Sequence, residues 1–438
     1  MNKKSITFDD LTTHQKEIAN AILEEFEVSD IVTLAGAAGC GKTFCLHGLI
    51  QKLVTETNCD ITMTAPTHKA VTLLENNYSI VTTIHKALGL VLVREFGTQK
   101  LQSIGKAFSG EYLIIDEASM IGVELLNFVR DVISSGKFKK VLLCGDSYQL
   151  APIEPISKGK KPNYNAKAII PAFTGLPVFT LTEIIRQKKD SNIITLANEI
   201  KDCFDKKAFF LSKKLQSELG FNILRLDDCI DAYVDELKQD MKFSENNRIV
   251  SYTNDRVDYI NNIIRKKVFG DNVEEYRVGE TIIIQQPFVI SIPNKNYKEV
   301  LINNGEELII TKSDKCFYKF TDGKFSSTLT TYKVCVKYYN VELLLVAQES
   351  IKAYNDIKKY LFSKRGEKKN DWNRYWKFID TFNIVKYSYA STIHKSQGST
   401  YIACLFDLYA MPDYHPDLFN RLFYVATTRA STDLFFME

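Results

Sequence analysis

The sequence contains no long apolar run, no Cys-x-x-Cys pair and only a small net charge. None of its 438 residues lies in a stretch approaching the roughly 18 consecutive apolar residues of a membrane span, and residues 1–10 hold no apolar core of a signal peptide. The nine cysteines are an odd number without disulfide-framework or zinc-site spacing. These absences argue against secretion and membrane insertion, and they predict a folded protein in a reducing cytoplasm.

The composition is that of an ordinary globular chain, with 45% hydrophobic, 25% charged and 12% aromatic residues, and it excludes the disordered and collagen-like classes. The length corresponds to about three domains. The net charge of +3 is unevenly placed: residues 350–377 hold nine Lys or Arg and three acidic residues, a net charge of +6, so the rest of the chain carries −3. The position of the charged residues therefore indicates a binding partner better than the net charge of the chain does.

Short apolar runs in the first third alternate with helical patterns, which predicts parallel βαβ units. The runs are 31–35, 61–65, 112–115 and 141–144, and each is followed by polar residues. A similar pattern returns at 248–252, with a helix over 255–268, and again near Leu405. Between these, residues 270–346 are rich in Ile, Val, Thr and Tyr and predict the hairpins of a small β domain. Ligands are expected where the parallel strands end.

Residues 36–43 spell Gly-Ala-Ala-Gly-Cys-Gly-Lys-Thr, a complete phosphate-binding loop between a predicted strand and a predicted helix. Its backbone N–H groups and the helix N-terminus surround phosphate oxygens, while the lysine reaches the β and γ phosphates and the threonine hydroxyl ligates Mg²⁺. The predicted nucleotide-binding residues of this loop are Gly36, Ala37, Ala38, Gly39, Cys40, Gly41, Lys42 and Thr43.

A pair of carboxylates, Asp116 and Glu117, follows the apolar run 112–115. Asp116 suits the magnesium shell of the nucleotide, and Glu117 is placed to orient or deprotonate an attacking water. An Asp-Glu pair by itself is more often a solvated loop. Behind a buried strand in a chain with a phosphate-binding loop, we interpret it as functional.

The ordered set of motifs resembles that of superfamily 1 helicases, most closely the RecD-like, 5′→3′ branch. The set comprises the phosphate loop, the Asp-Glu pair, Gly-Asp-Ser-Tyr-Gln at 145–149, Ala-Pro-Thr-His-Lys-Ala at 65–70, Thr-Ile-His at 83–85, Leu-Thr-Glu-Ile-Ile-Arg at 181–186, Ser-Thr-Ile-His-Lys-Ser-Gln-Gly at 391–398 and Tyr-Val-Ala-Thr-Thr-Arg-Ala at 424–430. The matches extend from Gln15 to Arg429, nearly the whole chain. The resemblance implies two RecA-like P-loop domains with ATP and Mg²⁺ in the cleft between them.

For the ATP site, the resemblance implies that Gln15 reads the adenine and that Gln149 senses the γ-phosphate. Arg186 and Arg429 match two arginine fingers from the second lobe, a role worth about 10³ to 10⁵ in rate. Tyr252 either stacks on the adenine or packs in the core.

For the DNA, the resemblance implies backbone contacts that do not read base identity. The residues concerned are Pro66, Thr67, His68 and His85 in the first lobe, with Ser391, Thr392 and His394 in the second. Residues 354–377 place aromatic side chains, including Trp372 and Trp376, among the basic residues. This composition fits a surface that stacks bases and follows phosphates, and it fits equally an amphipathic helix with core aromatics and a solvated basic face.

Residues 90–104 alternate around a turn that contains glycine and predict a β-hairpin. In this branch of the family an insertion here is the strand-separating pin, so Phe96 at its tip is either a wedge or a core aromatic.

The predicted fold class is α/β, with two RecA-like lobes, an inserted hairpin and a small SH3-like β domain. The predicted division is a first lobe of residues 1–65 and 105–177, a pin at 66–104, a second lobe of 178–269 and 380–438, and a β domain at 270–379. The predicted function is that of a monomeric ATP-dependent helicase acting on single-stranded and forked DNA, with a single-strand-binding or replication protein as a possible partner. An ATP-switched clamp and the motor subunit of a nuclease remain as alternatives.

Overall fold

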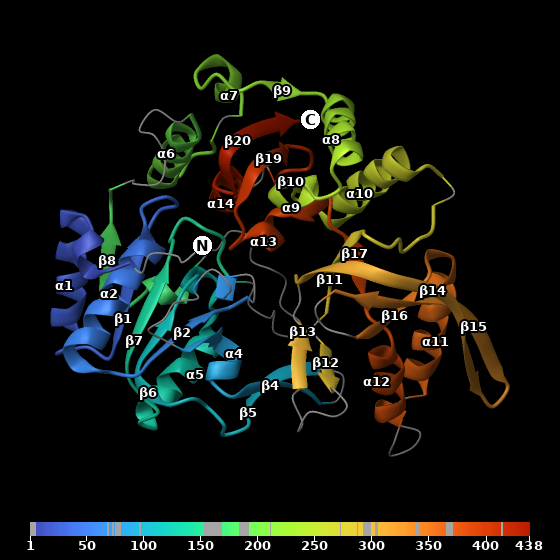
Figure 1. Cartoon of the computed structure of the whole chain (residues 1–438), viewed down its shortest axis with the longest axis horizontal. Coiled ribbons are helices and arrows are strands. Elements are labelled where there is room, and N and C mark those ends of the chain that lie inside the picture. The colour runs from blue at the N-terminus through green and yellow to red at the C-terminus, as the bar shows by residue number, and fades with distance from the viewer. Residues whose placement is uncertain are drawn as a thin grey trace.

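The computed structural model describes residues 6–67, 70–71, 74, 80–95, 98–152, 169–183, 192–210, 212–271, 273–286, 288–291, 299–302, 305–337, 341–364, 371–412 and 415–438. Within these residues, two parallel sheets and one antiparallel sheet form the framework of the molecule (Figure 1). The predicted α/β class, with two lobes built on parallel sheets and a small β region, is confirmed. No helix among the described residues is long and apolar enough to cross a membrane.

The first sheet has six parallel strands in the order β3-β2-β6-β7-β1-β8. Their bounds are β1 (Ile31–Gly36), β2 (Ile61–Ala65), β3 (Ile80–Thr83), β6 (Gly110–Ile115), β7 (Phe138–Gly145) and β8 (Val178–Leu181). The central strands read as almost unbroken apolar runs because helices cover both faces. One face packs against α1 (Thr13–Glu25) and α2 (Lys42–Thr57), and the other against α4 (Ile84–Ala87) and α5 (Val123–Ser134).

Strand β8 corrects the predicted division of the chain. Residues 178–269 were assigned to the second lobe, but β8 pairs with β1 in the first sheet. Strand β8 has only four residues, and a single one of them is buried, so its sequence pattern gave little indication of which sheet it would join.

The second sheet has five parallel strands in the order β18-β10-β19-β20-β9. They are β9 (Ile223–Leu224), β10 (Asn247–Ser251), β18 (Ala390–Thr392), β19 (Tyr401–Asp407) and β20 (Ala430–Met437). On one face lie α6 (Asn192–Asp205), α7 (Lys214–Ser217) and α14 (Pro416–Thr427), and on the other α8 (Leu226–Gln239), α9 (Phe243–Asn246) and α10 (Asn254–Phe269). The short α13 (Ile393–Ser396) follows β18.

The third sheet is antiparallel, with the order β16-β15-β14-β11-β17. It consists of β11 (Thr281–Ile284), β14 (Glu307–Asp322), β15 (Phe325–Val336), β16 (Glu342–Val346) and β17 (Val385–Tyr387), and α11 (Ile351–Ser363) and α12 (Asp371–Thr381) pack against it. Strand β17 is a second correction, because residues 380–438 were assigned to the second lobe and β17 pairs with β11 instead. Two separate hairpins complete the fold, β12 (Phe288–Ser291) with β13 (Glu299–Ile302) and β4 (Leu90–Glu95) with β5 (Thr98–Ser103). The latter is the hairpin predicted over 90–104.

The described residues also include four single-turn 3-10 helices, which precede or connect the longer elements: η1 (Phe8–Asp10), η2 (Ala118–Met120), η3 (Pro171–Phe173) and η4 (Gln348–Ser350).

Two buried ion pairs join the second lobe to the β sheet. Arg248 of β10, whose side chain is 1% exposed, donates to Glu307 of β14 at 2.9 Å. Arg265 of α10 donates to Glu280, just before β11, at 2.7 Å. Breaking a buried pair from one side leaves an uncompensated charge, so these contacts hold the two parts in a fixed relation.

Candidate functional site

The phosphate-binding loop lies between β1 and α2, as predicted, and its conformation depends on glycine. Gly39 and Gly41 have φ of 83° and 77°, a region that side chains with a Cβ rarely adopt. A Cβ on Gly36 would lie 2.4 Å from the sulfur of Cys40. The backbone therefore turns tightly enough to present its N–H groups around an anion at the start of α2.

Lys42 is held in this loop by its own backbone. Its Nζ donates to the carbonyl oxygens of Gly36 at 2.9 Å and Ala37 at 3.1 Å. Burial alone would lower the pKa of Lys42, but the negative charge of Asp146 and, less strongly, of Glu117 outweighs it, and the pKa lies above its ordinary value. The lysine is thus a permanent cation at the place where phosphates are expected.

Gln15 lies in the first turn of α1 and contacts the loop. Its Oε1 accepts from the backbone N–H of Thr12 at 3.1 Å in a capping box, and its Nε2 donates to the carbonyl of Gly41 at 3.3 Å. The side chain is 1% exposed. The structure therefore brings Gln15 to the nucleotide loop, where the same amide also caps a helix.

The two carboxylates after β6 are buried beside one another. Asp116 accepts from the N–H of Glu117 at 2.9 Å, and burial raises its pKa. Burial and the charge of Asp116 also raise the pKa of Glu117, against the opposing effect of Arg429 and Lys42. Glu117 has a φ of 52°, a strained conformation for a residue with a side chain, and its Oε2 has no hydrogen-bond partner among the described residues.

The loop after β7 is where the two lobes meet. Gln149, 3% exposed, accepts through Oε1 from Gln397 of the second lobe at 2.9 Å and from Ser119 at 3.4 Å. Arg421 of α14 donates to the backbone carbonyls of Ser147 and Gln149 at 2.7 and 2.6 Å. The loop is therefore held by side chains that come from the opposite side of the cleft.

A further contact crosses the cleft at the phosphate loop. The hydroxyl of Tyr424 accepts from the N–H of Ala38 at 3.0 Å and donates to Asp146 Oδ2 at 2.8 Å. A cavity of about 110 Å³ remains between the phosphate loop and the second lobe, and α6 contributes Asn198 and Lys201 to its lining. Tyr424 is the first residue of the motif at 424–430, but the motif alone assigned no role to this tyrosine, and Arg421 lies outside the motifs found in the sequence.

Of the two predicted arginine fingers, Arg429 lies among the described residues and Arg186 does not. Arg429 is 5% exposed and donates to its own lobe, to the carbonyls of Ser399 at 2.7 Å and Ser396 at 3.3 Å. It nevertheless lies close enough to Glu117 to oppose the rise of its pKa. Arg186 lies outside the described residues.

Two short segments in different lobes share the sequence Thr-Ile-His-Lys and the same geometry. Thr83 accepts from the N–H of Lys86, and Thr392 from that of Lys395, at 3.4 and 3.3 Å. Each segment follows a strand at the edge of its parallel sheet. Burial lowers the pKa of both histidines, His85 and His394, so both imidazoles are neutral at pH 7. This correspondence was not anticipated from the sequence.

The remaining predicted DNA residues are placed as follows. Pro66 and Thr67 follow β2, and Thr67 caps the next turn by accepting from the N–H of Ala70 at 3.2 Å. Ser391 lies on β18, 5% exposed, and its hydroxyl has no hydrogen-bond partner among the described residues. His68 and Phe96 lie outside the described residues.

Tyr252 was given two readings, and the structure places its ring 6.2 Å from that of His394. Tyr252 is partly buried and packs against the core of the second lobe next to a predicted DNA residue, and a stack on the adenine stays a prediction.

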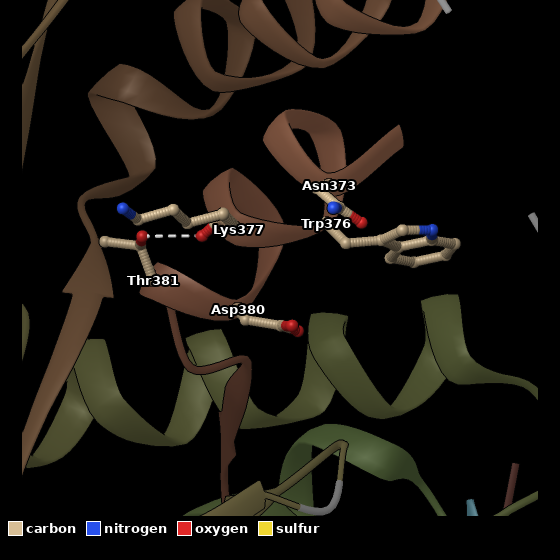
Figure 2. Close-up of a pocket in the computed structure, with 5 residues that line it drawn as sticks. All are labelled: Asn373, Trp376, Lys377, Asp380 and Thr381. Atoms are coloured by element: carbon tan, nitrogen blue, oxygen red, sulfur yellow. Dashed lines mark hydrogen bonds between the residues drawn. The ribbon is translucent and has the colours of Figure 1, made fainter. Parts of the chain in front are cut away.

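The basic and aromatic segment forms α11 and α12. Trp372 and Trp376 lie nearly parallel with ring centres 6.4 Å apart, while Tyr354 and Phe378 enter the core beside the antiparallel sheet. Trp376 borders an open hollow of about 590 Å³, and Figure 2 shows its indole along the outer side of α12. The segment is thus amphipathic, with Trp376 half-buried at its surface, and a DNA-stacking role for the two tryptophans stays a prediction.

The fold and the site together define a P-loop ATPase of two RecA-like lobes. Residues 10–213 match the family model described as an AAA domain, and residues 387–437 match the UvrD-like helicase C-terminal domain. The chain is 27% identical to the ATP-dependent DNA helicase dda of Enterobacteria phage T4, over 99% of this chain and 100% of that protein. It is 28% identical to the ATP-dependent DNA helicase PIF1 of Candida albicans, over 38% of this chain and 20% of that protein.

Solved structures show the same fold. A Pif1 helicase studied for unwinding at forked double-stranded DNA aligns with a TM-score of 0.51 at 19% identity, covering 97% of this chain and 92% of the other. The Pif1 helicase from Bacteroides, in complex with ADP-AlF3 and single-stranded DNA, aligns with a TM-score of 0.50 at the same identity and coverage. The chain is thus similar over nearly its whole length to the Dda helicase, and it shares the fold of the Pif1 helicases.

Proposed function

We propose that the protein is an ATP-dependent DNA helicase that moves along single-stranded DNA and separates the strands of a forked duplex. The observation that carries the proposal is the hydrogen bond between Gln149 and Gln397. Gln149 belongs to the nucleotide side of the first lobe, and Gln397 comes three residues after His394, a predicted DNA contact. A change at the phosphates therefore has a direct route to the DNA side.

The DNA track is supported by the matched Thr-Ile-His-Lys segments, one at the edge of each parallel sheet. Neutral imidazoles, hydroxyls and backbone N–H groups bind phosphate without reading bases. The buried, unpartnered hydroxyl of Ser391 adds a free donor beside one of the segments. Because each lobe carries one such segment, one lobe can keep its contact with the DNA while the other lobe moves along it. The direction 5′→3′ follows from the family resemblance.

The nucleotide site uses groups from both lobes. Lys42 stabilises the charge that develops on the phosphates, Glu117 orients and deprotonates the attacking water, and Arg186 and Arg429 complete the site from the second lobe. Thr43 and Asp116 offer the hydroxyl and carboxylate oxygens that suit Mg²⁺, which would neutralise phosphate charge there. ATP binding then favours the closed cleft, and hydrolysis releases it.

The proposed division of the chain follows the sheets. The first lobe extends to Leu181, the pin is the β4–β5 hairpin, and the β domain includes β17, which leaves β9, β10, β18, β19 and β20 to the second lobe. The free state of all nine cysteines suits a reducing cytoplasm, and the protein is proposed to act as a monomer.

A forked duplex with a 5′ single-stranded tail tests the proposal, alongside DNA-stimulated ATP hydrolysis. The expected result is strand separation that requires ATP, is absent on a fork with only a 3′ tail, and is lost in Lys42→Ala. DNA-stimulated hydrolysis without strand separation would indicate an ATP-switched clamp instead.

A further inference from the structure

The hydroxyl of Tyr424 occupies a position at the phosphate loop that a nucleotide would also use. It accepts the N–H of Ala38, the third residue of the loop, at 3.0 Å. Backbone N–H groups of such loops are the donors that bind phosphate oxygens. A tyrosine of the second lobe therefore occupies the Ala38 N–H, a donor that the first lobe would otherwise offer to a phosphate.

The second hydrogen bond of the same hydroxyl fixes its role as a donor. Tyr424 is 1% exposed and donates to Asp146 Oδ2 at 2.8 Å, and Asp146 is itself fully buried. Burial, together with the nearby charge of Asp146, raises the pKa of Tyr424 well above its ordinary value, so the phenol stays protonated. The Tyr424 hydroxyl thus pairs at once with a donor of the first lobe, the Ala38 N–H, and with an acceptor of the same lobe, the Asp146 carboxylate.

The space left at this point is small. The cavity between the phosphate loop and the second lobe, with Tyr424 in its wall, has a volume of about 110 Å³. Pockets that hold ligands of nucleotide size measure about 300–1,000 Å³. This cavity alone does not hold a nucleotide, so a phosphate oxygen that binds the Ala38 N–H must take the place of the Tyr424 hydroxyl.

We propose that Tyr424 is a latch that ties α14 of the second lobe to the phosphate loop by pairing with Ala38 and Asp146, and that incoming phosphate displaces its hydroxyl from the Ala38 N–H. The inference rests on the proposed nucleotide site. Because α14 carries both Tyr424 and Arg421, displacement of the hydroxyl shifts the helix that also holds the Ser147 and Gln149 carbonyls. Arrival of the phosphate is then reported to the second lobe through α14.

The latch predicts an unusual direction of effect for Tyr424→Phe. Removing the hydroxyl removes a competitor for the Ala38 N–H, so nucleotide binds more tightly. One hydrogen bond of ordinary net strength corresponds to a fall in Kd of about 2- to 12-fold. A residue that only supports the fold would give unchanged or weaker binding when truncated.

The experiment measures Kd for ADP and for a non-hydrolysable ATP analogue in the wild type, Tyr424→Phe and Tyr233→Phe. Tyr233 is the matched control, because its buried hydroxyl bonds to Asn247 within the second lobe and not to the cleft. Hydrogen exchange of the loop peptide without nucleotide is the second readout. Exchange at Ala38 is expected to be faster in Tyr424→Phe and unchanged in the control.

Tighter binding together with faster exchange in Tyr424→Phe alone supports the latch. Equal or weaker binding, or unchanged exchange at the loop, overturns it and leaves the proposed function standing. A wild-type protein that bound neither nucleotide would overturn the proposed function and the latch together.

Discussion

Glu117→Gln is expected to abolish ATP hydrolysis and, at the same time, to make the protein more stable. The carboxylate is needed to orient and deprotonate water, and loss of a general base costs about 10² to 10⁴ in rate. In the folded protein, however, the same group lies buried next to Asp116, in a strained backbone, with Oε2 unpartnered among the described residues. Glutamine keeps the shape and removes the charge.

The size of the gain follows from these contacts. An unsatisfied buried polar atom costs about 1–3 kcal/mol, and glutamine recovers part of this because it is neutral. We expect a gain of about 1 kcal/mol, in the range of stabilising substitutions at active sites, or about 1 °C in apparent Tm for a chain of this length. ATP binding is retained, because Lys42 and the loop are untouched.

The gain depends on pH with a definite sign. The pKa of Glu117 in the folded protein lies above its ordinary value of 4.5. Below that value the carboxyl is protonated in both the folded and the unfolded chain, so the variant gains little. As the pH rises through the pKa of the folded protein, the wild type must ionise a buried group and loses stability that the variant keeps. The difference in Tm therefore widens from acid to neutral pH.

Thermal unfolding at several pH values, with ATP turnover on the same preparation, checks both effects. Glu111→Gln is the matched control, since Glu111 lies on β6, the strand that precedes Glu117, but forms a surface ion pair with Lys139 and should change stability by less than about 0.5 kcal/mol. A Glu117→Gln protein that hydrolysed ATP at the wild-type rate would refute the assignment of the base. One that was no more stable than the wild type at neutral pH would refute the account of the buried charge.

Four further outcomes are expected. Arg186→Ala and Arg429→Ala should retain DNA affinity while DNA-stimulated kcat falls by about 10³ to 10⁵; weakened DNA binding with normal turnover would place these arginines on the DNA track. Phe96→Ala should remove unwinding of a fork but leave DNA-stimulated ATPase near normal, whereas a buried Phe would lose about 3–5 kcal/mol of stability and every activity together. Trp376→Ala should weaken single-stranded DNA binding by about 1–3 kcal/mol, and an unchanged Kd would make α12 a purely structural helix. Arg248→Ala should cost about 3–5 kcal/mol in chemical denaturation, because the partly exposed Glu307 loses its counter-charge and the carbonyls of Ser244 and Ser388 lose a buried donor, and a smaller loss would mean that water replaces these contacts.

The parts of the molecule that were predictable from sequence are those with local rules. The phosphate loop is specified by glycines that must adopt positive φ, and the strands around it by apolar runs covered on both faces. The hairpin at 90–104 was predictable because period-2 alternation and a turn lie next to each other in the chain. Each of these signals is contained within about a dozen residues.

The parts that were not predictable depend on partners far away in the chain. Tyr424 meets Ala38 across 386 positions, and Arg421 meets Gln149 across 272. Strands β8 and β17 joined sheets other than those expected, because a strand of three or four residues carries too little pattern to specify its neighbour. Which side chains cross the cleft is decided by how the lobes dock, and spacing along the sequence does not encode it.

The ion pair between Arg248 and Glu307 fixes one end of the long β14–β15 hairpin to the second lobe. Glu307 is the first residue of β14, so the pair anchors the strand at the second lobe, and its 16 residues extend up to about 50 Å away from that point (Figure 1). For an arm of that length, a rotation of about 4° moves the free end by about 3.4 Å, the rise of one nucleotide along a duplex strand. A small rotation of the second lobe therefore moves the tip of β14 by about the length of one nucleotide.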